Sequence, residues 1–306
     1  MGGVISGFAV IAVVVGVGYL LGRWTVLGAS GREVLSLLTF NVATPALLFA
    51  LTSASDLAVL LSQPLLVTVL ATLVCAGVFV VVGALRRWGV GRTTIGALSA
   101  SYVNAGNLGI PIASYVLGDA SLMVPVILFQ MVLYTPVALT VIDLAQGAGG
   151  VPAWRRVATP LRNPVVVAAL AGIVVSVTGL TLWHPLGDAV DLIAGMAVPA
   201  MLLAYGISLR GASTPGRGED SAMVWLAVAL KTVLQPVLAW VLAALVFGLE
   251  GPTLLAVVVI AALPAAQNIF THASRYRVGV DQAREVILLT TLLAPVALTV
   301  VAALLG

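Results

Sequence analysis

The stretch that decides the fold is SYVNAGNLGIPIASYV, from Ser101 to Val116. It lies inside a long apolar segment, yet two asparagines, two glycines and a proline fall between Asn104 and Pro111. Proline removes a backbone donor and glycine adopts conformations that other residues avoid, so a regular helix is disfavoured here. At membrane depth, irregular backbone is tolerated only where protein buries it or where it lines a watery cavity. We therefore expect a helix that is interrupted at this point for a functional reason.

The composition places the whole chain in a membrane. Hydrophobic residues make up 61% of the sequence and charged residues 8%, with a mean hydropathy of +1.17. Soluble domains carry roughly 25% charged residues, so this chain cannot cover a water-facing surface. We predict an all-α integral membrane protein. The net charge of +3 does not indicate a nucleic-acid partner, because the arginines sit in short loops beside apolar segments.

Ten segments are long and apolar enough to cross the hydrocarbon core, which takes about 20 residues. The first is interpreted as a membrane helix rather than a cleaved signal peptide, because no basic stretch precedes it. The predicted spans are 4–22, 33–53, 63–85, 93–116, 122–144, 163–182, 187–209, 222–247, 252–274 and 284–304.

The loops alternate in charge. Every even-numbered loop lacks lysine and arginine, whereas every odd-numbered loop carries arginine. Cytoplasmic loops are enriched in these residues, so the odd loops are predicted to face the cytoplasm. This orientation predicts a multi-pass protein of the cell (inner) membrane with both termini extracytoplasmic. The arginines of the odd loops are Arg23, Arg32, Arg86, Arg87, Arg92, Arg155, Arg156, Arg162, Arg210, Arg217, Arg275, Arg277 and Arg284.

The two halves of the chain resemble each other. The fifth and tenth spans share VIL followed by PVALTV, and the third and eighth share a QP motif before apolar residues. We predict two five-helix repeats, 1–146 and 163–306, joined by a cytoplasmic linker at 147–162. Because five is odd, the second repeat is inverted, a plan typical of secondary transporters. The ninth span, the partner of the fourth, is also interrupted and reads LPAAQN from Leu263 to Asn268.

Two interrupted spans would bring half-helices together at the midplane of the membrane. We expect the second halves to begin near Pro111 and Pro264, with N-terminal N–H groups that suit a carboxylate. The bland alternative is that each break is a kink, or that a buried amide only bonds a neighbouring helix. The same alternative applies to the polar residues in other spans. The candidate substrate-binding residues are Asn104, Asn107, Pro111, Gln130, Pro264, Gln267, Asn268, Asn41 and Thr44.

Lys231, the one lysine of the chain, lies inside the eighth predicted span. A charge at that depth is costly, which makes a functional role the first hypothesis. It could attract an anionic substrate or occupy the position of a coupling cation. The alternatives are snorkelling toward the cytoplasm and pairing with a carbonyl at a helix break.

The motif NAGNLGIPI in the fourth span and the proline-broken ninth span resemble the auxin efflux carrier family in its short prokaryotic form. In this resemblance Asn104, Asn107 and Pro111 match the first crossover, and Pro264 with Asn268 the second. The resemblance implies a fold like the sodium–proton antiporters and bile acid symporters, with crossed helices 4 and 9. Helices 1, 2, 6 and 7 would form a scaffold that often dimerises, and helices 3–5 and 8–10 a transport domain. Members carry organic anions, including auxins in plants and small dicarboxylates in bacteria.

The leading hypothesis is a secondary transporter that moves a small organic anion across the bilayer by alternating access, as a homodimer. No cofactor or metal is expected, and sodium coupling, proton coupling and facilitated diffusion all stay open. The alternatives are a sodium-coupled symporter of a larger, bile-acid-like anion and a non-transporting receptor or channel. An enzyme is not expected, because two distant histidines and one apolar cysteine, Cys75, supply neither a metal site nor an activated nucleophile.

Overall fold

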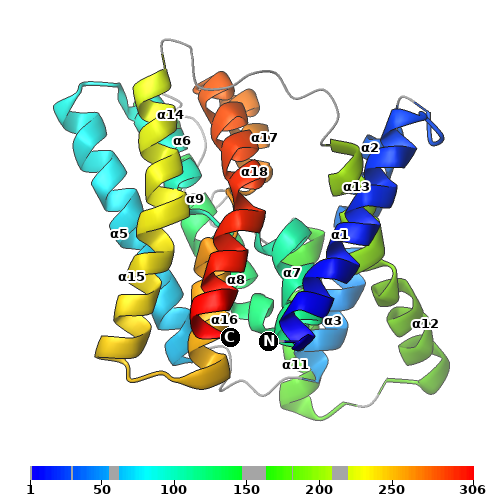
Figure 1. The fold of residues 1–306 in the computed structure, drawn as a ribbon. Helices are drawn as coiled ribbons and strands as arrows, with labels where there is room; N and C mark the ends of the chain where they lie inside the picture. Colours follow the sequence, from blue (N-terminus) through cyan, green and yellow to red (C-terminus); the bar gives the residue numbers. More distant parts are fainter. Residues whose placement is uncertain (1, 29, 55–61, 147–162, 181, 209–219) are drawn as a thin grey trace. The chain divides into compact units, whose positions relative to one another are not determined.

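The protein is all-helical. Its computed structural model describes residues 2–28, 30–54, 62–146, 163–180, 182–208 and 220–306 (Figure 1). Within these ranges there is no strand, only one isolated bridge between two connecting segments. Six helical segments are long and apolar enough to cross a membrane, and four shorter apolar helices accompany them. The six are Gly31–Ser53, Gln63–Leu85, Ala120–Ala145, His184–Ile207, Ser221–Val246 and Val280–Leu305.

The helices follow the predicted ranges. In its described part, each of the ten predicted spans is helical, and the fourth and the ninth are interrupted. The predicted linker 147–162, with its three arginines, lies outside the described residues, as do Arg210 and Arg217. The membrane-protein class is thus confirmed. The count of ten spans and the inverted repeat remain predictions.

The chain divides into two compact units. Unit 1 comprises Met1–Ser62, Gly106–Met131 and Ala158–Ala212, and unit 2 comprises Gln63–Ala105, Val132–Val157 and Ser213–Gly306. The boundary therefore falls inside the fourth predicted span and again inside the fifth.

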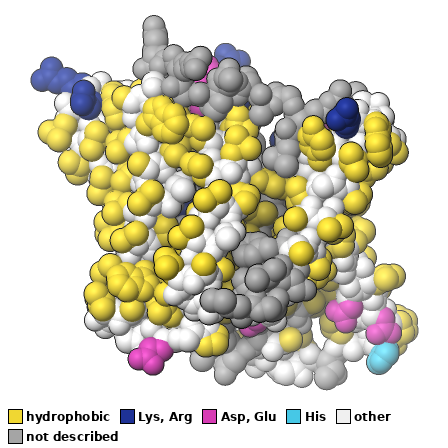
Figure 2. Space-filling model, viewed as in Figure 1, with side chains coloured by type: hydrophobic (Ala, Val, Ile, Leu, Met, Phe, Trp, Pro, Cys, Tyr) yellow, Lys and Arg dark blue, Asp and Glu magenta, His cyan; other side chains and the backbone are white. Residues whose placement is uncertain are grey.

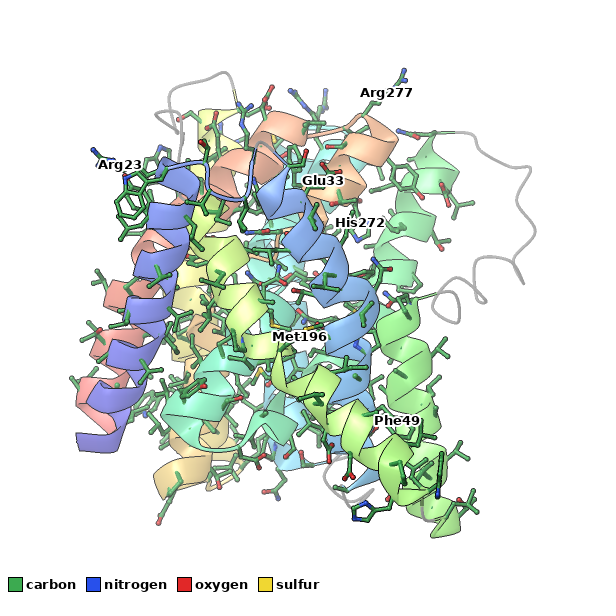
Figure 3. All side chains as sticks on the ribbon, turned by 90° about the vertical axis from the view of Figure 1, so that its right-hand side faces the viewer. Arg23, Glu33, Phe49, Met196, His272 and Arg277 are labelled. Atoms are coloured by element: carbon green, nitrogen blue, oxygen red, sulfur yellow. The ribbon has the colours of Figure 1, made fainter. Side chains whose placement is uncertain are left out.

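Unit 1 is built on two groups of packed helices, one of two helices and one of three. Helix α1 (Gly2–Arg23) runs along α13 (Ala197–Ser208), and α3 (Thr44–Ser53) packs against α11 (Pro164–Thr178) and α12 (His184–Gly195). Glycine permits the first contact, because a Cβ at Gly206 would lie 2.2 Å from the carbonyl oxygen of Val15. Such close approach is typical of small residues between membrane helices. Figure 3 shows Met196 at the bend where α12 passes into α13. The shorter elements of unit 1 are α2 (Gly31–Leu38), η1 (Thr39–Ala43), α7 (Ile110–Ile112), η3 (Ala113–Leu117), η4 (Ala120–Leu122) and α8 (Met123–Leu128).

Unit 2 holds the remaining helices around a core of small and branched side chains. Phe79, Ile95, Ile269 and Val286 are fully buried and come from four different helices. Figure 1 shows the long helices of this unit lying side by side, and α5 contacts both α6 and α15. The helices are α5 (Gln63–Leu85), α6 (Val90–Ser101), α9 (Thr135–Ala145), α14 (Ser221–Ala229), η7 (Leu230–Leu234), α15 (Gln235–Val241), η8 (Leu242–Val246), α16 (Gly251–Ala262), α17 (Asn268–Tyr276) and α18 (Val280–Leu305).

The surface matches a bilayer rather than water. Figure 2 shows apolar side chains covering the flanks of the helices, with charged side chains gathered at the helix ends of each unit. Leu73, Val81 and Val296 are among the many exposed apolar side chains on these flanks. Exposed apolar flanks are stable in hydrocarbon, where helices already satisfy their own backbone groups.

Four prolines widen the helix turn that precedes them. A π-helical segment ends two residues before each of Pro45, Pro111, Pro136 and Pro236. Proline cannot donate to the carbonyl four residues earlier, so the preceding turn opens to a longer hydrogen-bonded ring. These segments are η1, η2 (Ala105–Gly109), η5 (Phe129–Tyr134) and η7, and they contain Asn41, Asn107, Gln130 and Lys231 respectively. One sequence-predicted polar residue of each of these four spans thus lies on an irregular turn.

Candidate functional site

The first break follows α6. Ser99 and Ser101 each donate a hydrogen bond to the carbonyl four residues earlier, at 2.9 and 2.7 Å, which competes with continued helix. Tyr102 is then extended, with φ −79° and ψ 119°. The helix resumes at Ala105. The predicted break from Asn104 to Pro111 is therefore wrong in position: the irregular segment is Tyr102–Asn104.

Pro111 does not begin the second half-helix. It lies within the helical run from Ala105 to Leu117, where Gly109 already has helical φ and ψ of −63° and −49°. Pro111 has no backbone N–H to donate, and the wide η2 turn before it accommodates this loss. The helix therefore continues through the proline.

The second break follows α16. Leu263 is extended, with φ −58° and ψ 146°, because proline disfavours helical geometry in the residue before it. Pro264 thus ends α16 and does not start the next half-helix, contrary to the prediction. The second half, α17, begins at Asn268.

The two breaks meet inside unit 2. Val103 and Ala265 form an antiparallel bridge, and the Asn104 N–H donates to the Pro264 carbonyl at 2.9 Å. The Ala265 N–H donates to the Thr290 hydroxyl of α18 at 3.1 Å. These bonds satisfy backbone groups that would otherwise be unpaired within the membrane. These bonds join the two irregular segments in one structure, which we call the crossing.

Two side chains of the helix Ser221–Val246 bind the C-terminal ends of α6 and α16, which are the first halves of the two interrupted spans. Lys231 donates to the carbonyl of Ala261, near the end of α16, at 2.9 Å, and to the side-chain oxygen of Gln235 at 2.7 Å. Gln235 donates to the carbonyl of Ser101, the last residue of α6, at 2.8 Å. Carbonyls at helix C-termini lack intrahelical partners, so these bonds complete both ends.

Lys231 is 1% exposed, and it is the one charged residue among the described side chains that is fully buried. Burial excludes snorkelling, one of the alternatives. The pairing with a carbonyl at a helix break is confirmed. The neighbouring Cys75 Sγ lies 3.8 Å from the carbonyl oxygen of Leu230.

A hydroxyl and aromatic cluster lies beside the crossing. The rings of Tyr102 and Tyr134 stack with centroids 5.9 Å apart. Tyr102 Oη accepts hydrogen bonds from Asn268 Nδ2 at 3.1 Å and from Thr135 Oγ1 at 3.4 Å. Ser101 Oγ and Tyr134 Oη are also hydrogen-bonded.

The candidate residues separate between the units. Asn104, Lys231, Pro264, Gln267 and Asn268 lie in unit 2, close to the crossing. The others lie in unit 1, where Asn41 is exposed and bonds its own helix through the Leu37 carbonyl at 2.9 Å, whereas Thr44 and Gln130 are buried. The candidates of unit 1 are Asn41, Thr44, Asn107, Pro111 and Gln130.

Sequence reasoning missed Tyr102, Gln235 and Thr290. Gln235 carried a readable signal, because a carboxamide four residues after a buried lysine lies on the same helix face. Tyr102 and Thr290 carried none that sets them apart from other tyrosines and threonines. In the parts of the chain that the structure describes, no cluster of three or more His, Cys, Asp or Glu could hold a metal.

Comparison with known proteins identifies the family. The model of the family described as membrane transport protein matches residues 4–147 and 156–302. The chain belongs to this family. This membership confirms the resemblance to the auxin efflux carriers and makes the protein a membrane transporter rather than an enzyme.

Two relatives are similar over nearly their whole length. A protein of Rhizobium meliloti (strain 1021) named "Putative malonate transporter" is 29% identical over 293 residues, covering 92% of this chain and 89% of the relative. A protein of Methanothermobacter thermautotrophicus named "Uncharacterized transporter" is 25% identical over 298 residues, covering 94% of each chain.

Proposed function

We propose that this transporter is a secondary carrier of a small organic anion, a carboxylate, which it moves by alternating access. The observation that carries the proposal is the bonded crossing of two interrupted segments, Val103 with Ala265 and Asn104 with Pro264. Interrupted helices that meet at membrane depth are the usual binding point of secondary transporters. Helices resume on the far side of each break, at Ala105 and Asn268. The N–H groups of Ala105, Ile269 and Phe270 already donate to nearby carbonyls, so the helix dipoles, which are positive at these ends, supply the attraction for an anion.

The site proposed for the substrate comprises the crossing and the carboxamides of unit 2 around it, Asn104, Gln267 and Asn268. Neutral amides orient a carboxylate without adding charge, and the helix ends supply the electrostatic attraction. The relative named as a malonate transporter makes a small dicarboxylate the first substrate to test.

The proposed architecture is two inverted five-helix repeats with both termini extracytoplasmic. Helices 1, 2, 6 and 7 would form a dimerising scaffold, against which the other helices rock. Their separation into two compact units supports this division, with Gly106–Met131 grouped with the scaffold helices. The joints would then lie at the unit boundaries, after Ala105 and after Met131.

The test is electrical. Purified protein in liposomes on a solid-supported membrane is exposed to mono- and dicarboxylates, indole-3-acetate and their neutral analogues, with and without sodium and a pH gradient. We expect saturable currents for one class of carboxylate, whose ion dependence identifies the coupling. Absence of current and of thermal stabilisation with every carboxylate would overturn the anion-site proposal.

A further inference from the structure

The Tyr102 hydroxyl has an unused proton. Its oxygen accepts from Asn268 Nδ2 and Thr135 Oγ1, and these are its hydrogen bonds to the described residues. Tyr102 is 3% exposed, and its ring is held by stacking on Tyr134. A buried O–H without an acceptor is uncommon in native proteins and calls for an explanation.

The neighbouring carboxamide has an unused acceptor. Asn268 Oδ1 is buried and has no hydrogen-bond partner among the described residues, while its Nδ2 donates to Tyr102. A free donor and a free acceptor therefore lie on two bonded side chains, at the first residue of α17 and beside the end of α6.

The ligand group that satisfies both must carry an acceptor and a donor, as two atoms bonded to the same carbon do in a carboxyl group or an amide. An ionised carboxylate offers acceptors only, so it would leave Asn268 Oδ1 facing negative charge. A protonated carboxyl group accepts through its C=O and donates through its O–H. We infer that the Tyr102–Asn268 pair binds a carboxyl group in its protonated form, so that the substrate itself carries a proton. For a dicarboxylic acid the transported species is then the monoanion.

Ionisable groups of the protein also lie around the Tyr102–Asn268 pair, so the experiment must separate their titration from that of the substrate. Tyr134 faces Tyr102 from η5, Cys75 is buried on α5, and Lys231 on η7 reaches the end of α6 through Gln235. His272 lies one turn further along α17, toward the end where Figure 3 places Arg277. The charged residues of α18 lie in its first turns, from Asp281 to Glu285, well before Thr290.

The experiment compares three probes in proteoliposomes: malonate, its half-amide malonamate and its half-ester monomethyl malonate. The half-amide offers donor and acceptor at every pH, whereas the ester offers acceptors only. Between about pH 5 and about pH 8, the KM for total malonate should rise about tenfold per unit above the second pKa of malonate. The KM for malonamate should stay constant, and the half-ester should bind about tenfold more weakly than malonamate or worse.

A variant locates the effect. Tyr102→Phe keeps the ring stack and removes the donor, so the KM for malonamate should rise about tenfold. Tyr115→Phe is the control, because Tyr115 is exposed in η3. If Tyr102→Phe does not fold, the three probes on the unchanged protein still decide.

The inference rests on the proposed function, and the outcomes separate the two. A malonate KM that is flat or falls as the pH rises, with the ester bound as well as the amide, would overturn the inference while leaving the anion carrier intact. Asn268 would then turn its Nδ2 toward an ionised carboxylate. A KM for malonamate that changes with pH would also overturn the inference, because the titrating group would then belong to the protein and not to the substrate. No transport or binding of malonate, malonamate or any other carboxylate of the panel would remove both.

Discussion

Lys231 Nζ lies 2.9 Å from the carbonyl oxygen of Ala261, one residue before α16 ends at the crossing. The side chain is therefore engaged with the protein at both of its hydrogen-bonded contacts, Ala261 and Gln235. This arrangement favours a role in holding the break over direct attraction of the substrate.

Replacing Lys231 with methionine should destabilise the protein without weakening substrate binding. The variant leaves the Ala261 carbonyl and the Gln235 side-chain oxygen without a donor, at a cost of about 1–3 kcal/mol. Unfolding in mixed micelles measures the loss, and Val233→Met, which is exposed on the same turn, is the control. The KM of the folded variant for its carboxylate should change less than about twofold, a difference too small for a lost charge contact. A tenfold rise in KM at unchanged stability would return Lys231 to the substrate site.

Lys231 and Gln235 should act as one unit. Because they are hydrogen-bonded at 2.7 Å, the costs of Lys231→Met and Gln235→Leu should not add. The double-mutant cycle should give a coupling energy of about 0.5–3 kcal/mol. Gln63→Leu is the control for Gln235→Leu in the cycle with Lys231→Met, because Gln63 is an exposed carboxamide that also precedes a proline. Additive losses of stability for Lys231→Met and Gln235→Leu would show that the two side chains stabilise the ends of α16 and α6 independently.

Thr290→Val should loosen the crossing. The substitution keeps the shape of the side chain and removes the acceptor of the buried Ala265 N–H, so we expect a loss of about 1–3 kcal/mol. Thr299→Val on the same helix is the matched control. Thr299 is exposed and bonds only its own helix, so its loss should stay within about 0.5 kcal/mol. Equal effects of the two substitutions in mixed-micelle unfolding would contradict the proposed support from α18.

Gly206→Ala should separate α1 from α13. The added Cβ would lie 2.2 Å from the Val15 carbonyl oxygen and 2.8 Å from the Tyr19 nitrogen, backbone atoms that cannot rotate away. Overpacking of this kind costs about 1–3 kcal/mol. Gly16→Ala on α1 meets nothing within 4 Å and should be neutral or slightly stabilising. If both variants unfold alike, the close contact is not formed.

The membrane class and the two interrupted spans could be predicted from the sequence, because apolar length and the placement of proline and amide residues are local signals. The positions of the breaks could not. Tyr102 is a common residue inside helices, and its extended backbone follows from serine back-bonding and from pairing with a segment about 160 residues away, between Val103 and Ala265. The sequence predicts that Pro264 starts a half-helix, but the stronger effect of this proline is on the backbone of Leu263 before it.

The capping of both helix ends by a single turn of the eighth span was also beyond sequence reasoning. Lys231 stood out as the one lysine, whereas its partners are a main-chain carbonyl and a common carboxamide. Hydrogen bonds to main-chain atoms leave no residue-type signal. Only the i,i+4 spacing of Lys231 and Gln235 could have linked them.

The measurement that tests the central claim most directly is carboxylate transport by the double variant Asn104→Leu, Asn268→Leu. Currents and thermal stabilisation by malonate are compared with those of the unchanged protein and of Gln63→Leu, with folding checked by size-exclusion profile. A substrate held at the crossing predicts a folded double variant with neither current nor stabilisation, while Gln63→Leu retains both. Unaltered malonate current in the double variant would contradict binding at the crossing.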